Sequence, residues 1–160
     1  MARHSADHFT LVRRGLELHE ARKYAQALPY FERACGLAPR CATAGYNRAN
    51  TLHMLGKAEE AYHLLRKIVE ASLDDLREGC PQCGPRGLQS DAYFLLSLVV
   101  QHWRGDCEEA LRYAGEHLKR RKRGLYSLWT INEVRAKLES IRSGIESAEM
   151  NATRTMKRKR

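Results

Sequence analysis

Two cysteines on one short turn have the spacing of a chemical site. Cys80 and Cys83 stand in the run Cys-Pro-Gln-Cys-Gly, where two thiolates can converge on a zinc ion. A complete site needs two further ligands, and because no second such pair occurs, Cys107, a histidine or the same loop of a second copy would supply them. A redox pair and an inert reduced pair are the other two interpretations. We expect no cofactor, with zinc as the alternative.

The residue patterns of catalysis are missing from this sequence. No serine or cysteine stands in a nucleophile elbow, and no glycine-rich phosphate loop follows a strand. Adjacent carboxylates, such as Asp74 with Asp75, fall on neighbouring helical positions and face apart. We therefore expect that the protein is not an enzyme.

Basic residues outnumber acidic ones, 28 to 19, and the excess is localised in two runs. The first is Lys119, Arg120, Arg121, Lys122 and Arg123, and the second is 157–160. Such runs can bind phosphate backbones or act as a nuclear import address. They can equally be solvated cations at a helix C-terminus, where the helix dipole favours positive charge. Few aromatic residues accompany them, so nucleic-acid binding is the alternative function and not the first.

Length and composition indicate one intracellular domain. The 160 residues fit a single core, and the longest apolar run, 93–100, is far below the roughly 20 residues needed to cross a bilayer. The first ten residues lack the apolar core of an export signal, and five cysteines are an odd number for a disulfide framework. We expect a cytoplasmic protein with no membrane partner, or a nuclear one if the basic runs direct import.

The elements that position these residues repeat with a period of thirty-four. The first copy ends at Pro39, where a proline can stop a helix. Small and large apolar residues recur at matching offsets: Gly15, Leu18, Tyr24, Ala27, Phe31 and Ala34 are followed by Ala49, Leu52, Ala58, Ala61, Leu65 and Ile68. This period is typical of stacked helical hairpins, which form a binding surface.

The pattern predicts one all-α domain over 8–148. The predicted parts are three helix pairs at about 8–39, 42–72 and 91–119, a loop insertion at 73–90, a capping helix at 125–148 and a disordered basic tail at 149–160. The third pair is found because 105–110 echoes 56–61 after fifteen extra residues. The apolar stripe of the last helix could cover the stack or pair with a second copy, so a homodimer through this helix is an alternative.

These residues resemble the tetratricopeptide repeat family over about 8–118. The small residue of the family's first helix falls on Gly15 and Ala49, and its closing proline falls on Pro39. Its second-helix tyrosine falls on Tyr24, its helix-contact alanine on Ala27, Ala61 and Ala110, and its large apolar residue on Phe31 and Leu65. The third copy departs from the pattern at Leu98 and Ala114, and only the first copy has the proline.

The resemblance implies a short right-handed solenoid of about three antiparallel helix pairs plus a C-terminal capping helix. Its concave groove would accept a peptide or a helix of another protein. The groove residues that carry over best are His19, Tyr46, Asn47, Asn50, His53, His102 and Trp103. Val12, Leu16, Leu95 and Val99 either line the same groove or pack beneath the terminal helix.

Two finer expectations concern the polar residues of this groove. His19, His53 and His102 share one place in successive repeats, so we expect a ladder of imidazoles about 10 Å apart, too far for one metal ion. The family's clamp for acidic chaperone tails is disfavoured, because only Asn47 matches it while Val12, Ala92 and Leu96 replace its basic residues.

Overall fold

A computed structural model of the chain describes residues 3–79, 84–121, 124–125 and 127–158, and every regular element in these ranges is an α-helix. The helices are α1 (Arg3–Glu20), α2 (Tyr24–Leu37), α3 (Ala42–Met54), α4 (Ala58–Glu70), α5 (Leu73–Gly79), α6 (Pro85–Arg104), α7 (Cys107–Arg121) and α8 (Ile131–Arg158). The all-α solenoid predicted from the repeat is confirmed. Across the described ranges, no helix is both long enough and apolar enough to span a bilayer.

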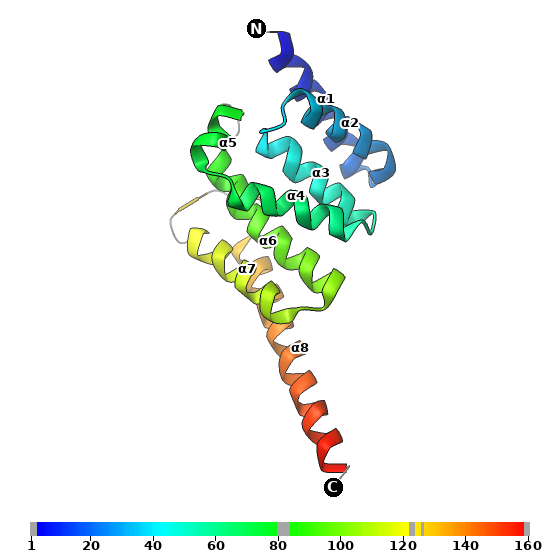
Figure 1. The fold of residues 1–160 in the computed structure, drawn as a ribbon, viewed down its shortest axis with the longest axis vertical. Coiled ribbons are helices and arrows are strands. Elements are labelled where there is room, and N and C mark those ends of the chain that lie inside the picture. The colour runs from blue at the N-terminus through cyan, green and yellow to red at the C-terminus, as the bar shows by residue number, and fades with distance from the viewer. Residues whose placement is uncertain (1–2, 80–83, 122–123, 126, 159–160) are drawn as a thin grey trace.

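Three antiparallel helix pairs, α1 with α2, α3 with α4 and α6 with α7, follow one another along the stack (Figure 1). Each pair turns at a residue with positive φ, at Arg22 (58°), Gly56 (77°) and Gly105 (65°). Glycine adopts this conformation freely because it has no Cβ. Arg22 makes the same turn without that freedom, so the first hairpin is held by its packing and not by its turn residue.

Small residues on the first helix of a pair let the second helix approach. A Cβ added to Gly15 would lie 2.7 Å from the ring of Phe31, which is fully buried. The first pair therefore has its own apolar cluster around Phe31. A larger cluster joins the later helices around Leu52, Leu65 and Val100. The predicted repeat residues thus form the core that sets the order of the helices.

The predicted loop insertion at 73–90 is helical over most of its described residues. α5 occupies its first part, and α6 begins at Pro85, before the predicted start at 91. The Asp75 backbone N–H donates to Ser72 Oγ at 3.0 Å, which satisfies a donor of the first turn of α5. Pro85 suits the start of α6 because a first-turn N–H has no helical partner. Gly79 ends α5 and Pro85 begins α6, so these two residues mark helix ends.

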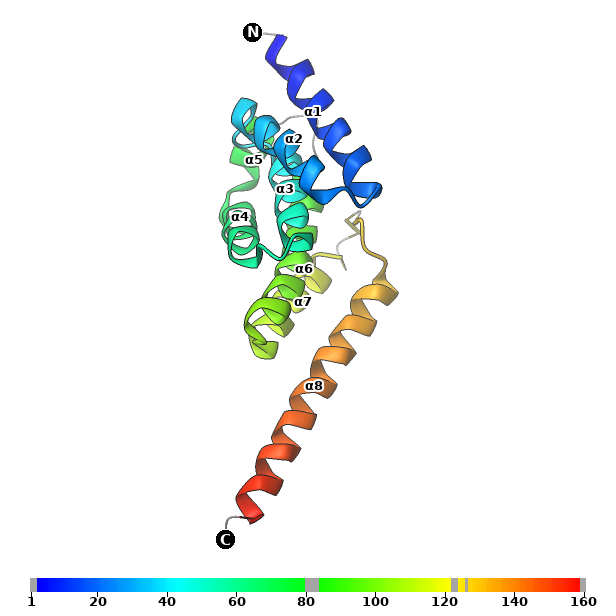
Figure 2. The same ribbon diagram turned by 90° about the vertical axis from the view of Figure 1, so that its right-hand side faces the viewer.

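The terminal helix α8 differs from the prediction at both ends. It begins after a capping box, in which the Thr130 N–H donates to the Glu133 carboxylate at 2.7 Å and the Glu133 N–H donates to Thr130 Oγ1 at 3.2 Å. It continues to Arg158, through most of the segment predicted to be a disordered tail. Its C-terminal half extends beyond the stacked pairs (Figure 2).

Candidate functional site

The predicted groove residues lie on α1, α3 and α6, and α8 packs mainly against α7, on the same side of the stack as α1 (Figure 2). Leu95 and Val99 are almost fully buried and share a core cluster with Ile141 of α8. Val12 and Leu16 pack instead in the cluster of the first pair. Val12 and Leu16 therefore fit neither predicted placement, whereas Leu95 and Val99 are buried in a cluster that includes a residue of the terminal helix.

Tyr46, predicted as a groove residue, is not on an open surface. It is 2 % exposed, and its hydroxyl accepts a hydrogen bond from Trp129 Nε1 at 3.3 Å. This burial raises the pKa of Tyr46. The repeat pattern does turn Tyr46 toward the inner face, but the segment between α7 and α8 covers that face here. The residues that cover Tyr46 lie outside the repeats, so the repeat pattern could not predict its burial.

Asp91 fixes this covering segment, and the sequence analysis did not identify it. The buried Asp91 carboxylate accepts hydrogen bonds from the Leu128 N–H at 2.8 Å and from the Ser127 hydroxyl. Arg121 Nη1 donates to the Trp129 carbonyl at 2.6 Å from the other side. Burial raises the pKa of the Asp91 carboxyl, while these donors act to lower it. The sequence did contain a signal for this role, because Asp91 directly precedes the apolar run 92–100. A carboxylate buried beside such a run needs hydrogen-bond donors.

A chain of polar side chains remains on the inner face between α1 and α3. Thr51 Oγ1 donates to the Asn47 carbonyl at 2.8 Å, so its lone pairs accept from His19 Nδ1 at 3.0 Å. His19 Nε2 then accepts from Asn50 Nδ2 at 3.4 Å. Burial lowers the pKa of His19, which agrees with a neutral imidazole in this tautomer. The side chains of His19, Asn47 and Asn50 are half-buried, so the structure brings three predicted residues together at a partly open face.

His53 and His102 are in direct contact, whereas the sequence predicted imidazoles separated by the spacing of packed helices. His102 Nδ1 lies 3.3 Å from His53 Nε2. The expectation used the spacing of the helix axes, but both side chains reach into the space between α3 and α6. Burial lowers the pKa of each, and Lys137 of α8 adds to the effect. His19 does not join the pair, because Thr51 and Asn50 hold it.

Trp103 points away from the inner face. Its ring packs against Tyr62 of α4, with ring centroids 5.6 Å apart, and the Arg104 guanidinium lies 4.1 Å from its centroid. The prediction of Trp103 as a groove residue is therefore corrected. Residue 103 stands at the last turn of α6, where a small rotation moves a side chain from the inner face to the edge shared with α4.

The basic run at the end of α7 is largely engaged with the protein itself. Arg120 Nη2 donates to the Tyr93 hydroxyl at 3.3 Å, and Arg121 holds the Trp129 carbonyl. Lys119 pairs with Glu116 at 2.6 Å on the surface. Lys122 and Arg123 lie outside the described residues, as do the side chains of 157–160. Arg120 and Arg121 are therefore bound within the protein, and the nucleic-acid alternative stays a prediction.

The candidate zinc ligands Cys80 and Cys83 lie outside the described residues, and their metal binding stays a prediction. In the ranges that the structure covers, no group of three or more histidine, cysteine or acidic side chains could hold a metal ion. Cys107 begins α7, whereas Gly84 precedes the opposite end of α6, about 30 Å away along a helix of this length. Cys107 is therefore not placed to complete a site beside Gly84.

Comparisons with known proteins agree with this architecture. Residues 18–78 match the family described as tetratricopeptide repeat. The fold is similar to the Sgt2 TPR domain from Aspergillus fumigatus, with a TM-score of 0.67 and 18% identity over 91% of this chain and 83% of that one. It is also similar to the TPR2AB domain of yeast Sti1 in complex with pHSP90, with a TM-score of 0.68 and 19% identity over 92% of this chain and 50% of that one. No curated protein matches the sequence. The stretch 18–78 therefore matches a tetratricopeptide-repeat model, and the chain as a whole has the fold of tetratricopeptide-repeat domains.

Proposed function

We propose that this protein is a non-enzymatic scaffold that holds a peptide or helix of a partner protein along a polar seam on its inner face. The seam consists of His19, Asn47, Asn50, His53 and His102. The observation that carries the proposal is their position: they follow one another over α1, α3 and α6 and keep solvent access. The apolar residues of the same face are covered.

The chemistry of the seam suits the main chain of a peptide. An asparagine amide offers both donors and acceptors, and a neutral imidazole offers one of each. Burial lowers the pKa of His19, His53 and His102, which favours the neutral form at neutral pH. A peptide laid along the seam would present alternating N–H and C=O groups to these side chains. Each bond made in a half-buried place adds modestly to affinity.

The apolar part of the groove is less available to a partner. Leu95 and Val99 share their cluster with Ile141, and Tyr46 is covered by Trp129. A partner that needs a wide apolar groove would have to displace α8. A terminal carboxylate also finds little there, because Val12, Ala92 and Leu96 are buried apolar residues where the family's clamp is basic. We therefore expect recognition through main-chain and neutral polar groups.

A matched pair of variants tests the seam. The double variant Asn50→Ala with His102→Ala removes two of its members, and the control Asn132→Ala with His63→Ala removes the same residue types from exposed positions on α8 and α4. Partners are captured by chemical cross-linking in cells and compared by mass spectrometry, after circular dichroism has shown equal helix content.

The expected result is a set of partners lost from the seam variant and kept by the control. Loss of two half-buried hydrogen bonds of about 1 kcal/mol each corresponds to a weakening of roughly thirtyfold. If both variants retain the same partners as the wild type, the seam is not the binding surface.

A further inference from the structure

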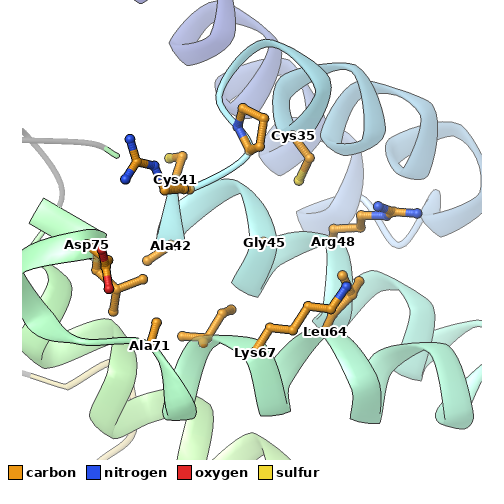
Figure 3. Close-up of a pocket in the computed structure, with 13 residues that line it drawn as sticks. Cys35, Cys41, Ala42, Gly45, Arg48, Leu64, Lys67, Ala71 and Asp75 are labelled. Carbon is orange, nitrogen blue, oxygen red and sulfur yellow. The ribbon is translucent and has the colours of Figure 1, made fainter. Parts of the chain in front are cut away.

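A recess lies where α2, α3, α4 and α5 meet (Figure 3), on the side of the stack away from α8 (Figure 2). Its volume is about 490 Å³, large enough for a few side chains of a bound segment. The end of α2 and the start of α3 form one wall, and α4 and α5 form the other. Its lining is Cys35, Pro39, Arg40, Cys41, Ala42, Gly45, Arg48, Leu64, Lys67, Ile68, Ala71, Asp75 and Leu76.

The insertion between the second and third repeats contributes one wall of this cleft. Leu76 of α5 is 5 % exposed and forms its far wall. Gln89 holds the insertion in place, because its side-chain amide donates to the carbonyls of Ile68 and Ala71 at 3.2 and 2.9 Å. Gly45 lets Ile68 of α4 pack closely against α3, since a Cβ at residue 45 would lie 3.3 Å from Ile68 Cδ1. The repeated hairpins therefore supply most of the cleft, and the inserted helix closes one side of it.

Positive charge dominates the cleft. Arg40, Arg48 and Lys67 line it, against one carboxylate, Asp75, which already accepts the Ser72 hydroxyl at 2.6 Å. The start of α3 adds the positive end of a helix dipole at Ala42. These charges leave a region of positive potential beside an apolar wall.

The internal partners of these cations are weak. Arg40 meets Glu78 only at 3.6 Å and Arg48 meets Glu32 only at 3.4 Å. Both carboxylates are well exposed, and exposed pairs of this kind contribute little. Arg48 Nε is buried and has no hydrogen-bond partner among the described residues. Lys67 is exposed and makes no ion pair in the described part of the chain. Arg40 and Lys67 are therefore open to a carboxylate supplied from outside, and Arg48 is open only through the exposed part of its guanidinium.

We propose that this cleft binds an acidic amphipathic peptide segment of a partner protein, with leucine-like side chains against Gly45, Ile68 and Leu76 and carboxylates at Arg48 and Lys67. The apolar lining distinguishes between two classes of negatively charged partner, nucleic acids and acidic peptides. A nucleic-acid backbone would use the cations and leave the apolar wall bare, whereas an acidic amphipathic peptide matches both. The site is separate from the polar seam, so the two proposals can fail independently.

Nuclear magnetic resonance of the ¹⁵N-labelled full chain provides the test. The probe is a short acetylated and amidated peptide of leucine and glutamate with helical amphipathic spacing. The comparison ligands are its counterpart with lysine in place of glutamate and a single-stranded RNA oligonucleotide. The expected result is that the glutamate peptide shifts the amide signals of Gly45, Ala71 and Leu76, and that neither comparison ligand does so.

Two charge variants then identify the cations involved. Lys67→Glu replaces an attraction with a repulsion at the rim and should weaken binding of the glutamate peptide by about tenfold. Arg135→Glu makes the same charge change on the exposed face of α8 and should leave the affinity unchanged. Lys67 is exposed, so its variant is expected to fold, and circular dichroism checks this.

Several results would overturn the proposal. These are an absence of shifts at saturating peptide, shifts confined to the inner face, equal shifts with the lysine peptide or RNA, and an unchanged affinity in Lys67→Glu. The Asn50→Ala with His102→Ala variant separates this proposal from the first, because it should bind the glutamate peptide like the wild type.

Discussion

Shortening one side chain of α8 should show how strongly this helix closes the inner face. Ile141 is fully buried in the cluster that contains Leu95 and Val99, whereas Met150 on the same helix is 58% exposed. Replacing a buried isoleucine with alanine costs about 2–5 kcal/mol, because both the transfer free energy and the contacts across the resulting cavity are lost. We take about 3 kcal/mol for Ile141→Ala. At roughly 2–4 °C per kcal/mol for a chain of this length, the melting temperature should fall by about 6–12 °C.

Thermal and urea unfolding followed by circular dichroism measure this loss, and Met150→Ala is the control. The control substitution lies beyond the docked turns of α8 and should change the stability by less than about 0.5 kcal/mol. The reasoning is refuted if Ile141→Ala unfolds within that same margin of the wild type, or if the two variants lose equal stability. Either result would mean that α8 does not cover the inner face in solution.

Two further predictions concern packing and pH. Gly15→Ala should destabilise the protein by about 1–2 kcal/mol, because its Cβ would lie 2.7 Å from the buried Phe31 ring. Gly115→Ala should stabilise it by about 0.5–1 kcal/mol, because a Cβ at residue 115 would meet nothing within 4 Å. Urea midpoints measure both changes, and a gain in stability in both variants would contradict the close contact at Gly15. Burial lowers the pKa of His53 and His102 in the folded state below the unfolded value of 6.5. As the pH falls below 6.5, the unfolded state therefore binds protons before the folded state does, and the free energy of unfolding decreases until the folded-state pKa values are reached. The urea midpoint should therefore drop between about pH 7.5 and 5.5, by less in His53→Gln with His102→Gln than in the exposed-site control His63→Gln. Equal drops in the two variants would exclude this pair as the cause.

The repeat spacing was enough to predict the three helix pairs and their order. A residue at a helix crossing must be small or large according to how closely the backbones approach, so Gly15, Ala27 and Phe31 indicate the hairpin without reference to the rest of the chain. The same local logic predicts turns at Gly56 and Gly105. These features depend on residues that are close in the sequence, so a periodic sequence is enough to predict them.

The cover of the inner face could not be predicted in the same way. The apolar stripe of α8 shows that the helix needs a partner surface, but several surfaces bury the same stripe. What selects the inner face is a set of contacts between distant residues, chiefly Asp91 with Leu128 and Tyr46 with Trp129. Trp103 shows the same limit on a smaller scale, because the rotation of the last turn of α6 depends on its packing against Tyr62.

The docked helix has a consequence for what the inner face can recognise. Because α8 is covalently tethered, it competes with any partner at the high effective concentration of an intramolecular contact, which for short linkers is in the millimolar range. An apolar helix from a partner would have to exceed that advantage to take the place of Ile141. A peptide that bonds to His19 and Asn50 avoids this competition, since these residues lie on α1 and α3, where the polar chain stays partly open, whereas His53 and His102 lie near Lys137 of α8. We propose that the terminal helix shifts the preference of the inner face from apolar helices toward polar, extended partners, and deletion of α8 should reverse that preference if the remaining pairs stay folded.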